Sequence, residues 1–455
     1  MKADRVTSKG FYLLVTFCAA GLLSGASPRS KKNLDTHFSN GSSYESAVSA
    51  DGQYVAFESV ATDLVDGDDS GTQHIYLRDR LSGVTRRITG HLDGTPLKRD
   101  CYLDGMSSDG RYILFSTGAD DVIAEPTPPG HDPEYRFDGY VYDRDTGKIE
   151  LVTVTPAGKR NLSMAFTSEI STDGRFVTFQ AWSNWDADSR NSWGQFYVRD
   201  RQLAKTFRIT NGFDGGPTQG GDSLGGSISA DGRYVVFSSA ATNLTPNATR
   251  GFMNVFLHDR ELGKTYLISK SQNETPANGH SVAPVISGNG RYIAYYTYST
   301  NMIADDTNEN VDVIIYDRST QTTTGVLTSQ GGVGGGWPYR HKDNAFSFDG
   351  SKFFFLSYFP FVSDDTNDWS DVYSYDLASR AVKRISVGPS GVQGNFGACR
   401  NAISTDGRFV SFANASTNFI PGDNAPDHYE VYVRDLQAGT TELISVPLAP
   451  GMFGL

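Results

Sequence analysis

One short segment gathers the side chains best suited to acid–base chemistry in this chain. Tyr339, Arg340, His341 and Lys342 follow a glycine-rich run at 331–336. A guanidinium or ammonium group can hold an anion, and an imidazole or a phenol can move a proton. The first three residues are therefore candidates for catalysis, and Lys342 is a candidate for ligand binding. The alternative is a solvated polar loop without a chemical role.

Further polar side chains occur shortly before other Asp-Gly pairs of the chain. These ligand-binding candidates are Asp104, Arg160, Glu169, His280 and Arg400. If the segments that carry them are arranged in a ring, the side chains crowd one mouth of its central channel. Cationic groups, a histidine and a tyrosine at one mouth could bind an anion. The alternative is a polar rim in contact with water.

Tryptophans add a second kind of binding surface. Trp182 and Trp193 are candidates for stacking on a sugar, because an aromatic ring offers an apolar face. The alternative places them in the hydrophobic core.

Two acidic loops have oxygen side chains at alternate positions. One loop, 305–312, contains Asp306, Asn308, Asn310 and Asp312, and the other, 364–371, contains Asp365, Asn367 and Asp371. Alternate oxygen ligands resemble the opening of a calcium-binding loop, so calcium is a candidate ligand of both. Both lack the glycine of the sharp turn, and Trp369 cannot be a ligand. The alternative is a loop in which Asp and Asn form the turn without a metal ion. Elsewhere, the sequence shows no histidine or cysteine spacing typical of zinc, no nucleophile elbow and no phosphate-binding loop.

All of these residues are held by one repeated unit. The phrase Ser-x-Asp-Gly-Arg-Tyr/Phe-Val-x-Phe recurs seven times in near copies. Its Asp-Gly pairs begin at Asp51, Asp109, Asp173, Asp231, Asp349 and Asp406, and Asn289-Gly290 takes the same place in a seventh copy. A period of this size is typical of a repeat architecture. What all copies share is expected to be scaffold, and a function performed once should lie where the copies differ.

Each copy predicts four antiparallel strands. In the fourth copy the strands are expected at 227–229, 233–237, 254–258 and 264–269, with a hairpin turn at Asp231-Gly232. The second strand is apolar on both faces, so both must be covered. Stacked four-stranded sheets arranged radially satisfy this requirement. The predicted fold is all-β, a seven-bladed β-propeller of four-stranded antiparallel blades.

The third strand of every copy ends in an aspartate. These residues are Asp79, Asp143, Asp200, Asp259, Asp317, Asp376 and Asp435, and five of them precede an arginine. We interpret them as turns that satisfy backbone donors, with the adjacent arginine as partner. The strand order places these turns and the Asp-Gly turns on one face. The longer and more variable loops lie on the opposite face, which is where function is expected.

The repeated phrase, followed by Ala-Thr-Asn-Leu, Asp-Thr-Asn and Val-Tyr-Val-Arg-Asp, resembles the TolB-like, WD40-like β-propeller repeats of bacterial envelope and secreted proteins. The resemblance covers roughly residues 46–448, with one repeat more than TolB itself. It implies the propeller fold and is unspecific for function. Similar propellers include polysaccharide lyases, in which a cation clamps a uronate and a His or Tyr takes the proton, and a few cyclases that alkylate aromatic rings.

The N-terminal residues predict export. Lys2, Arg5 and Lys9 precede an apolar run at 11–23 and small residues at 24–26, which is typical of a secretory signal peptide. An uncleaved short anchor is the alternative. The expected organisation is a signal peptide at 1–26, a lead segment at 27–45, the propeller at 46–448 and a tail at 449–455. A secreted or periplasmic location follows, without stable membrane insertion.

Charge and cysteine content limit the partners. The net charge is −12, which argues against nucleic acid as a partner. Cys101 and Cys399 fall in copies that are not neighbours, so two free thiols are favoured over a disulfide.

The leading hypothesis is an exported binding module for a protein or a glycan. The alternative is an enzyme at the channel mouth, either polysaccharide lyase-like or an alkylating cyclase, and the sequence leaves the oligomeric state open.

Overall fold

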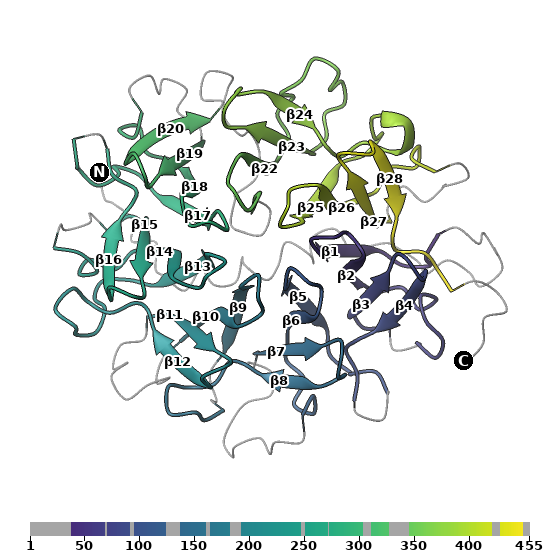
Figure 1. Cartoon of the computed structure of the whole chain (residues 1–455), viewed down its shortest axis with the longest axis horizontal. Helices are drawn as coiled ribbons and strands as arrows, with labels where there is room; N and C mark the ends of the chain where they lie inside the picture. The colour runs from purple at the N-terminus through teal and green to yellow at the C-terminus, as the bar shows by residue number, and fades with distance from the viewer. Residues whose placement is uncertain are drawn as a thin grey trace, which may run out of the picture. The chain divides into compact units, whose positions relative to one another are not determined.

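The seven sequence copies fold into seven four-stranded antiparallel sheets, which are the blades of a β-propeller (Figure 1). The computed structural model describes residues 38–68, 71–91, 95–123, 137–160, 164–182, 193–246, 251–271, 273–303, 311–326, 345–420 and 428–448. All of them belong to one unit, Thr36–Leu455. The predicted all-β, seven-bladed fold is confirmed.

The strands follow the chain, one blade after another. Blade 1 has β1 (Ser43–Val48), β2 (Tyr54–Ser59), β3 (His74–Asp79) and β4 (Val84–Arg87). Blade 2 has β5 (Cys101–Met106), β6 (Tyr112–Thr117), β7 (Asp138–Asp143) and β8 (Ile149–Leu151). Blade 3 has β9 (Ala165–Ile170), β10 (Phe176–Ala181), β11 (Gln195–Asp200) and β12 (Lys205–Arg208).

The remaining blades repeat this order. Blade 4 has β13 (Ser223–Ile228), β14 (Tyr234–Ser239), β15 (Asn254–Asp259) and β16 (Lys264–Leu267), and blade 5 has β17 (Ser281–Ile286), β18 (Tyr292–Thr297), β19 (Asp312–Asp317) and β20 (Thr322–Val326). Blade 6 has β21 (Ala345–Phe346), β22 (Lys352–Ser357), β23 (Asp371–Asp376) and β24 (Val382–Arg384). A short 3-10 turn, η5 (Pro389–Gly391), leads to blade 7, with β25 (Ala398–Ile403), β26 (Phe409–Asn414), β27 (Glu430–Asp435) and β28 (Thr440–Leu443).

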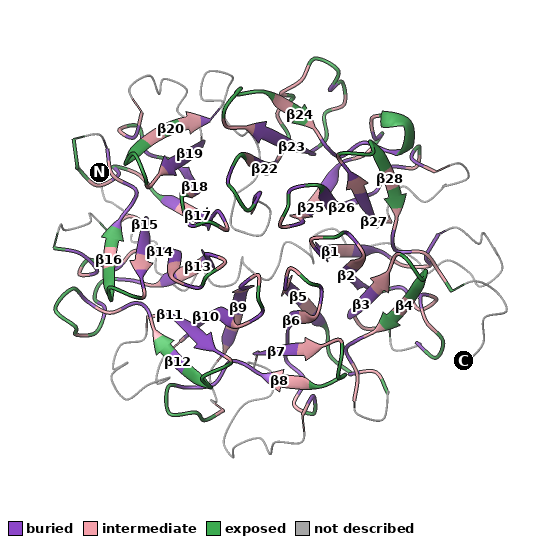
Figure 2. Ribbon diagram, in the orientation of Figure 1, coloured by how far each residue is buried: buried purple, intermediate pink, exposed green. Residues whose placement is uncertain are grey.

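The second strand of a blade is covered on both faces, as predicted. In β14, Val235 and Phe237 pack in one core cluster with Phe196 of blade 3. Val236, on the other face, packs with Ile286 and Tyr295 of blade 5. The hydrophobic core is therefore a series of layers between blades, and Figure 2 shows exposure concentrated on outer strands such as β4 and β16.

The Asp-Gly turn closes each inner hairpin with the same chemistry. In blade 4, Ser229 Oγ donates to Asp231 Oδ1 at 2.5 Å, and the backbone N of Tyr234 donates to Ser229 Oγ at 3.0 Å. Gly232 has a φ of 70°. A Cβ at this glycine would also lie 2.1 Å from the ring of Phe176 in blade 3. Both the turn and the packing of adjacent blades therefore require glycine here.

The aspartates that end the third strands form the predicted turns, but their arginine partner is a different one. Asp259 Oδ1 accepts the backbone N of Glu261 at 3.0 Å, which is the expected Asx-type turn. Its ion-pair partner is Arg233, just after the Asp-Gly pair, at 2.9 Å. The adjacent Arg260 instead lies over the Phe176 ring of blade 3, 4.4 Å from its centroid. The same exchange of partners recurs in the pairs Arg111–Asp143, Arg175–Asp200 and Arg291–Asp317. Arg408 pairs with Asp435 in the same way, although Asp435 has no arginine after it.

The ring closes between blade 7 and blade 1 without a shared sheet. Each blade consists of one continuous segment of the chain. The backbone N of Ser43 donates to Tyr429 O at 2.7 Å, and the N of Leu448 donates to Asp63 O at 2.8 Å. Ser39 Oγ also donates to the buried Glu430 carboxylate at 3.0 Å. Separately, no helix among the described residues is long and apolar enough to cross a membrane.

Candidate functional site

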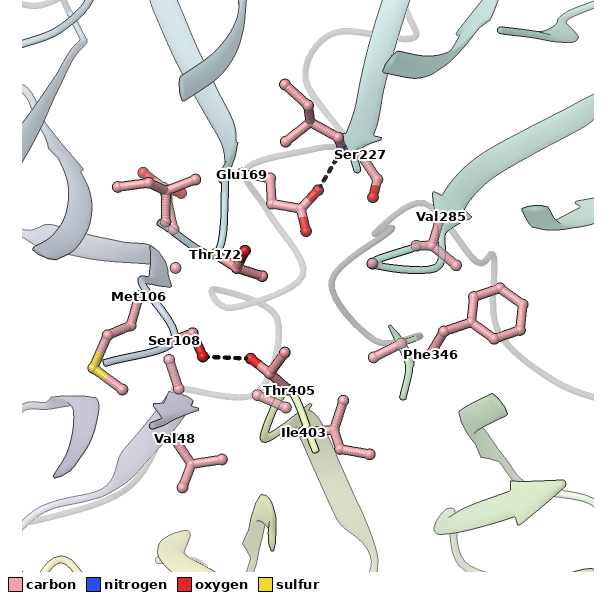
Figure 3. A pocket seen from close by; sticks show the side chains of 18 of the residues that line it. Val48, Met106, Ser108, Glu169, Thr172, Ser227, Val285, Phe346, Ile403 and Thr405 are labelled. Carbon is pink, nitrogen blue, oxygen red and sulfur yellow. Dashed lines mark hydrogen bonds between the residues drawn. The ribbon is translucent and has the colours of Figure 1, made fainter. Parts of the chain in front are cut away.

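The first strands of all seven blades line a central channel that contains a cavity of about 220 Å³. A ring of apolar side chains lines the end of this cavity that is nearest the Asp-Gly turns. Its members are Val48, Met106, Ile170, Ile228, Ile286, Phe346 and Ile403. Figure 3 shows several of them around the cavity, with Glu169 and Thr172 nearby.

A β-bulge interrupts the first strand in the six blades where this strand is described along its length. The register shifts between Leu103 and Gly105 in β5, and between Cys399 and Asn401 in β25. Arg400, the extra residue of β25, has a φ of 56°, and Gly225 occupies the corresponding place in blade 4. The bulge turns neighbouring side chains toward the channel or the next blade. No sequence signal marks the bulge, because the copies differ in sequence at this position.

Two predicted ligand-binding carboxylates join adjacent blades. Asp104 accepts a hydrogen bond from Thr167 Oγ1 of blade 3. Glu169 Oε2 accepts the backbone N of Ile228 in blade 4 at 2.8 Å. Both line the cavity, so the structure gives them a bracing role at its wall. Their role in ligand binding stays a prediction.

The structure also places Arg160 and His280 within the scaffold. The Arg160 side chain is 3% exposed, pairs with Asp138 at 3.2 Å and donates to Tyr140 OH at 3.0 Å. His280 Nδ1 accepts the backbone N of Met253 at 3.1 Å, and burial lowers the pKa of its imidazole. Because Nδ1 accepts this hydrogen bond, it carries no proton and the imidazole is in its neutral form. Nδ1 therefore cannot act as a proton donor. Ligand binding by these two residues stays a prediction.

The tryptophan candidates are half-buried. The Trp182 ring packs edge-on against Phe166, with centroids 5.6 Å apart, and Trp193 is also half-buried. Sequence analysis missed Trp369 as a sugar-stacking candidate. It is 46% exposed and stacks on Phe396 of blade 7, with centroids 5.3 Å apart. Its place in an Asp- and Asn-rich loop drew attention to metal binding instead.

The acidic loop at 364–371 directs its oxygens to separate protein partners. Asp365 accepts from Tyr373 OH and, at 2.9 Å, from Gln393 Nε2, while Asp371 accepts from Ser386 Oγ. Within the described ranges, no group of three or more acidic, His or Cys side chains could hold a metal ion. Most of the other candidate calcium loop, 304–310, lies outside the described residues, as do Tyr339, Arg340, His341 and Lys342.

Arg400 belongs to a group of side chains at the junction of blades 6, 7 and 1, which we call the mouth cluster. Its members are Tyr44, Glu45, Tyr358, Cys399, Arg400 and Tyr429. Arg400 Nε lies 3.5 Å from Glu45 Oε2, and the rings of Tyr44 and Tyr429 have centroids 5.8 Å apart. The Tyr358 side chain is on the loop after β22 and is 50% exposed. The cluster lies at the start of the first strands, on the face opposite the Asp-Gly turns.

Two tyrosines of the mouth cluster, Tyr44 and Tyr429, are held in their protonated form. Burial raises the pKa of Tyr429 to about 12, with smaller effects from the Cys399 thiol and the Tyr358 and Tyr44 hydroxyls that outweigh the opposing Arg400 charge. Burial also raises the pKa of Tyr44. Both phenols therefore act as hydrogen-bond donors near neutral pH, and neither is a ready general base.

The two described cysteines are free thiols, as favoured from the sequence. Cys101 is buried in β5, and burial raises the pKa of its thiol to about 12. A thiol with so high a pKa is a poor nucleophile. Cys399 is half-buried in the mouth cluster, and its blade is separated from that of Cys101 by blade 1.

Comparisons with known proteins support the fold. No protein-family model and no curated protein matches this chain. The oligogalacturonate lyase from Vibrio parahaemolyticus superposes with a TM-score of 0.50 at 12% identity, over 88% of this chain and 91% of that one. A puromycin-hydrolyzing peptidase from Mycobacterium tuberculosis gives 0.52 at 11% identity, over 90% of this chain and 54% of its own.

TolB from Acinetobacter baumannii matches with a TM-score of 0.41 at 12% identity, over 86% of this chain and 80% of that one. Solved structures of TolB and of related propeller proteins are therefore among the matches, and the chain itself is a seven-bladed propeller. At such identities the likeness concerns the fold alone.

Proposed function

We propose that this protein is a binding module that holds a neutral glycan at the mouth cluster. The observation that carries the proposal is an exposed tyrosine, Tyr358, near enough to the Tyr44–Tyr429 pair to affect the pKa of Tyr429, together with the Arg400–Glu45 ion pair. An aromatic face favours stacking on the apolar side of a sugar ring. An adjacent guanidinium and carboxylate offer donors and acceptors to sugar hydroxyls.

The charges at the mouth favour a neutral ligand over an anionic one. Glu45 already neutralises Arg400, and the buried Glu58 lies close enough to Tyr44 to raise the pKa of its phenol. The net charge of the chain is −12. An anionic polymer would therefore meet repulsion at long range and a competing carboxylate at Arg400.

The strained backbone at Arg400 supports a role for its side chain. A non-glycine residue at positive φ carries a conformational cost of about 1 kcal/mol or more. Gly225 occupies the corresponding bulge position in blade 4. The scaffold thus accepts a residue without a side chain at this position, and Arg400 adds an ion pair that faces the mouth.

The enzyme hypotheses rest on a tyrosine or histidine base, and the tyrosines and the histidine that the structure describes near the mouth are not suited to this role. The phenols of Tyr44 and Tyr429 have raised pKa values, and the lone pair of His280 Nδ1 already accepts a hydrogen bond from the backbone N of Met253. A lyase-like or cyclase-like mechanism would depend on Tyr339 and His341, which lie outside the described residues. We therefore favour binding without turnover. The signal-peptide pattern at 1–26 supports a secreted or periplasmic location for the ligand.

Isothermal titration calorimetry against a panel of neutral oligosaccharides tests the proposal. Tyr358→Ala should weaken binding about tenfold, because it removes an exposed stacking surface at the mouth. Tyr266→Ala is the matched control, since Tyr266 is 42% exposed on the outer strand β16. Equal affinities of the wild type and the Tyr358→Ala variant would contradict the proposal. So would conversion of the oligosaccharide to a new product by the wild type.

A further inference from the structure

The channel cavity contains a buried polar side chain that lacks a partner. Asn401 of β25 is 1% exposed and lines the cavity. Within the described part of the chain, neither its Nδ2 nor its Oδ1 has a hydrogen-bond partner. Leaving a buried amide without a hydrogen-bond partner is energetically costly, and such groups are rare in native structures. The amide therefore points to something that the cavity accommodates.

The cavity and the mouth cluster share one residue. Glu45, the partner of Arg400, is also one of the residues that line the cavity. Asn401 directly follows Arg400 and comes after the bulge in β25. A ligand that contacts Arg400 and Glu45 at the mouth can therefore extend to Asn401.

At the face of the Asp-Gly turns, hydrogen bonds join the blades around the channel. Thr405 Oγ1 donates to Ser108 Oγ at 3.0 Å, which joins blades 7 and 2 across the inner end of blade 1 (Figure 3). Between these blades, the backbone N of Ala50 donates to Ser108 O at 2.8 Å. The cavity thus reaches from residues at the Asp-Gly turns, such as Ser108 and Thr405, to Glu45 of the mouth cluster.

The size and lining of the cavity define the chemistry of its occupant. A volume of about 220 Å³ is roughly fifteen times what a single water needs. The carboxylates of Glu45, Asp104 and Glu169 lie around it, which disfavours an anion. Each carboxylate already has a protein partner, which is Arg400 for Glu45, the Thr167 hydroxyl for Asp104 and the backbone N of Ile228 for Glu169. The Asn401 amide offers two donors and an acceptor, which match neighbouring hydroxyls of a neutral ring.

We propose that the channel cavity is a subsite for the terminal unit of a neutral glycan and that the Asn401 amide binds its hydroxyls. This inference rests on the proposed function, because the chain that ends in the cavity is the glycan held at the mouth cluster. The inference adds to the proposed function that the protein recognises the end of the glycan chain. A glycan whose terminal hydroxyls are blocked cannot occupy the subsite, and additional units beyond the mouth contribute little.

The replacement of Asn401 by leucine separates binding from stability. Leucine has a similar shape and no polar atoms, so Asn401→Leu removes the unsatisfied amide and should leave the melting temperature unchanged or higher. Glycan affinity should fall about tenfold, the loss expected for a missing hydrogen bond of this kind. Asn401→Ala provides a second variant that avoids overpacking.

A second buried asparagine of the same blade provides the matched control. Asn414 is also 1% exposed, but its Oδ1 accepts the backbone N of Ser416 at 2.7 Å. Asn414→Leu should therefore lower the melting temperature, because it leaves a buried N–H without an acceptor. The opposite thermal responses of the two variants distinguish a ligand-binding amide from a structural one.

Calorimetry with neutral oligosaccharides, in free and terminally O-methylated forms, decides between the outcomes. The inference predicts loss of affinity in Asn401→Leu and for the methylated forms. Unchanged affinity in Asn401→Leu and Asn401→Ala, with Tyr358→Ala still impaired, would overturn it and leave the proposed function standing. If the protein bound only oligosaccharides that carry an amine, the proposal that the ligand is neutral would be overturned. Failure of the wild type to bind any neutral oligosaccharide would overturn both proposals.

Discussion

At the scale of single residues, one carboxyl of the scaffold, that of Asp371, lies where its charged form is disfavoured. Asp371 is buried in blade 6 and accepts a hydrogen bond from Ser386 Oγ. Burial raises the pKa of its carboxyl to about 7, and the neighbouring Asp365 acts in the same direction. Asn254 occupies the equivalent place in blade 4, where its Oδ1 accepts from Ser269 Oγ at 3.0 Å. A neutral side chain therefore suits this position.

The pKa of Asp371 predicts a pH dependence of stability. Because the folded-state pKa lies above its ordinary value of 3.8, the stabilising contribution is complete below that pH and is lost as the pH rises through about 7. The loss is at most on the order of 4 kcal/mol. Asp371→Asn should flatten the fall in melting temperature between about pH 5 and about pH 8. Thermal melts across this range check the prediction, and an unchanged slope in the variant would contradict it.

At the scale of elements, the inner hairpin is the unit that the sequence specifies most strongly. Ser229, Asp231 and Gly232 contribute to one turn, and the alternation of Val235, Val236 and Phe237 assigns each face of β14 to a neighbouring blade. Strand existence and blade count were predictable for this reason. The first strand is longer than expected, because β13 begins at Ser223 and continues through the bulge.

Glycine is required in the turns for two different reasons, its backbone conformation and its packing, and Gly232 and Gly263 allow the two to be measured separately. Both have positive φ, 70° and 62°, but a Cβ at Gly232 would strike the Phe176 ring whereas Gly263 faces open space. Gly263→Ala should lower the free energy of unfolding by about 1–2 kcal/mol, the cost of the left-handed conformation. Gly232→Ala should lose about 1–3 kcal/mol more, because the methyl group also displaces the adjacent blade. Chemical denaturation of both variants measures the difference, and equal losses would refute the packing argument.

The candidate site was less predictable than the blades. Arg400 was identified because it departs from the other copies, and the structure places it in an ion pair at the mouth. Asn401, its neighbour, gave no signal, since its importance lies in a bulge and in the absence of a partner. Arg160 resembled a channel residue in sequence, but it folds back onto Asp138 within blade 2. Spacing along a strand predicts a face only where the register is regular.

At the scale of the whole molecule, noncovalent contacts close the ring. Phe38 is 4% exposed, and Ser39 is fully buried against Glu430 of blade 7. These residues precede β1 and extend the contact between the first and last blades. Since each core layer is shared by two blades, weakening this junction affects the ring as a unit.

Removing the segment before β1 should therefore destabilise the entire ring. A chain that begins at Ser43 should be less stable than one that begins at Thr36 by on the order of 3 kcal/mol, because it loses the burial of Phe38. Differential scanning calorimetry should show one transition at a lower temperature. A second, separate transition for blades 7 and 1 alone, or an unchanged melting temperature, would contradict the account.

The central claim is that a neutral glycan enters the channel from the variable face at the junction of blades 6, 7 and 1. A crystal structure of the protein soaked with a neutral oligosaccharide from the calorimetric panel tests it most directly. The account predicts a sugar ring stacked on Tyr358, with the terminal unit in the channel within hydrogen-bond distance of the Asn401 amide. A sugar bound on the face of the Asp-Gly turns, or against the outer strands with an empty channel mouth, would contradict it.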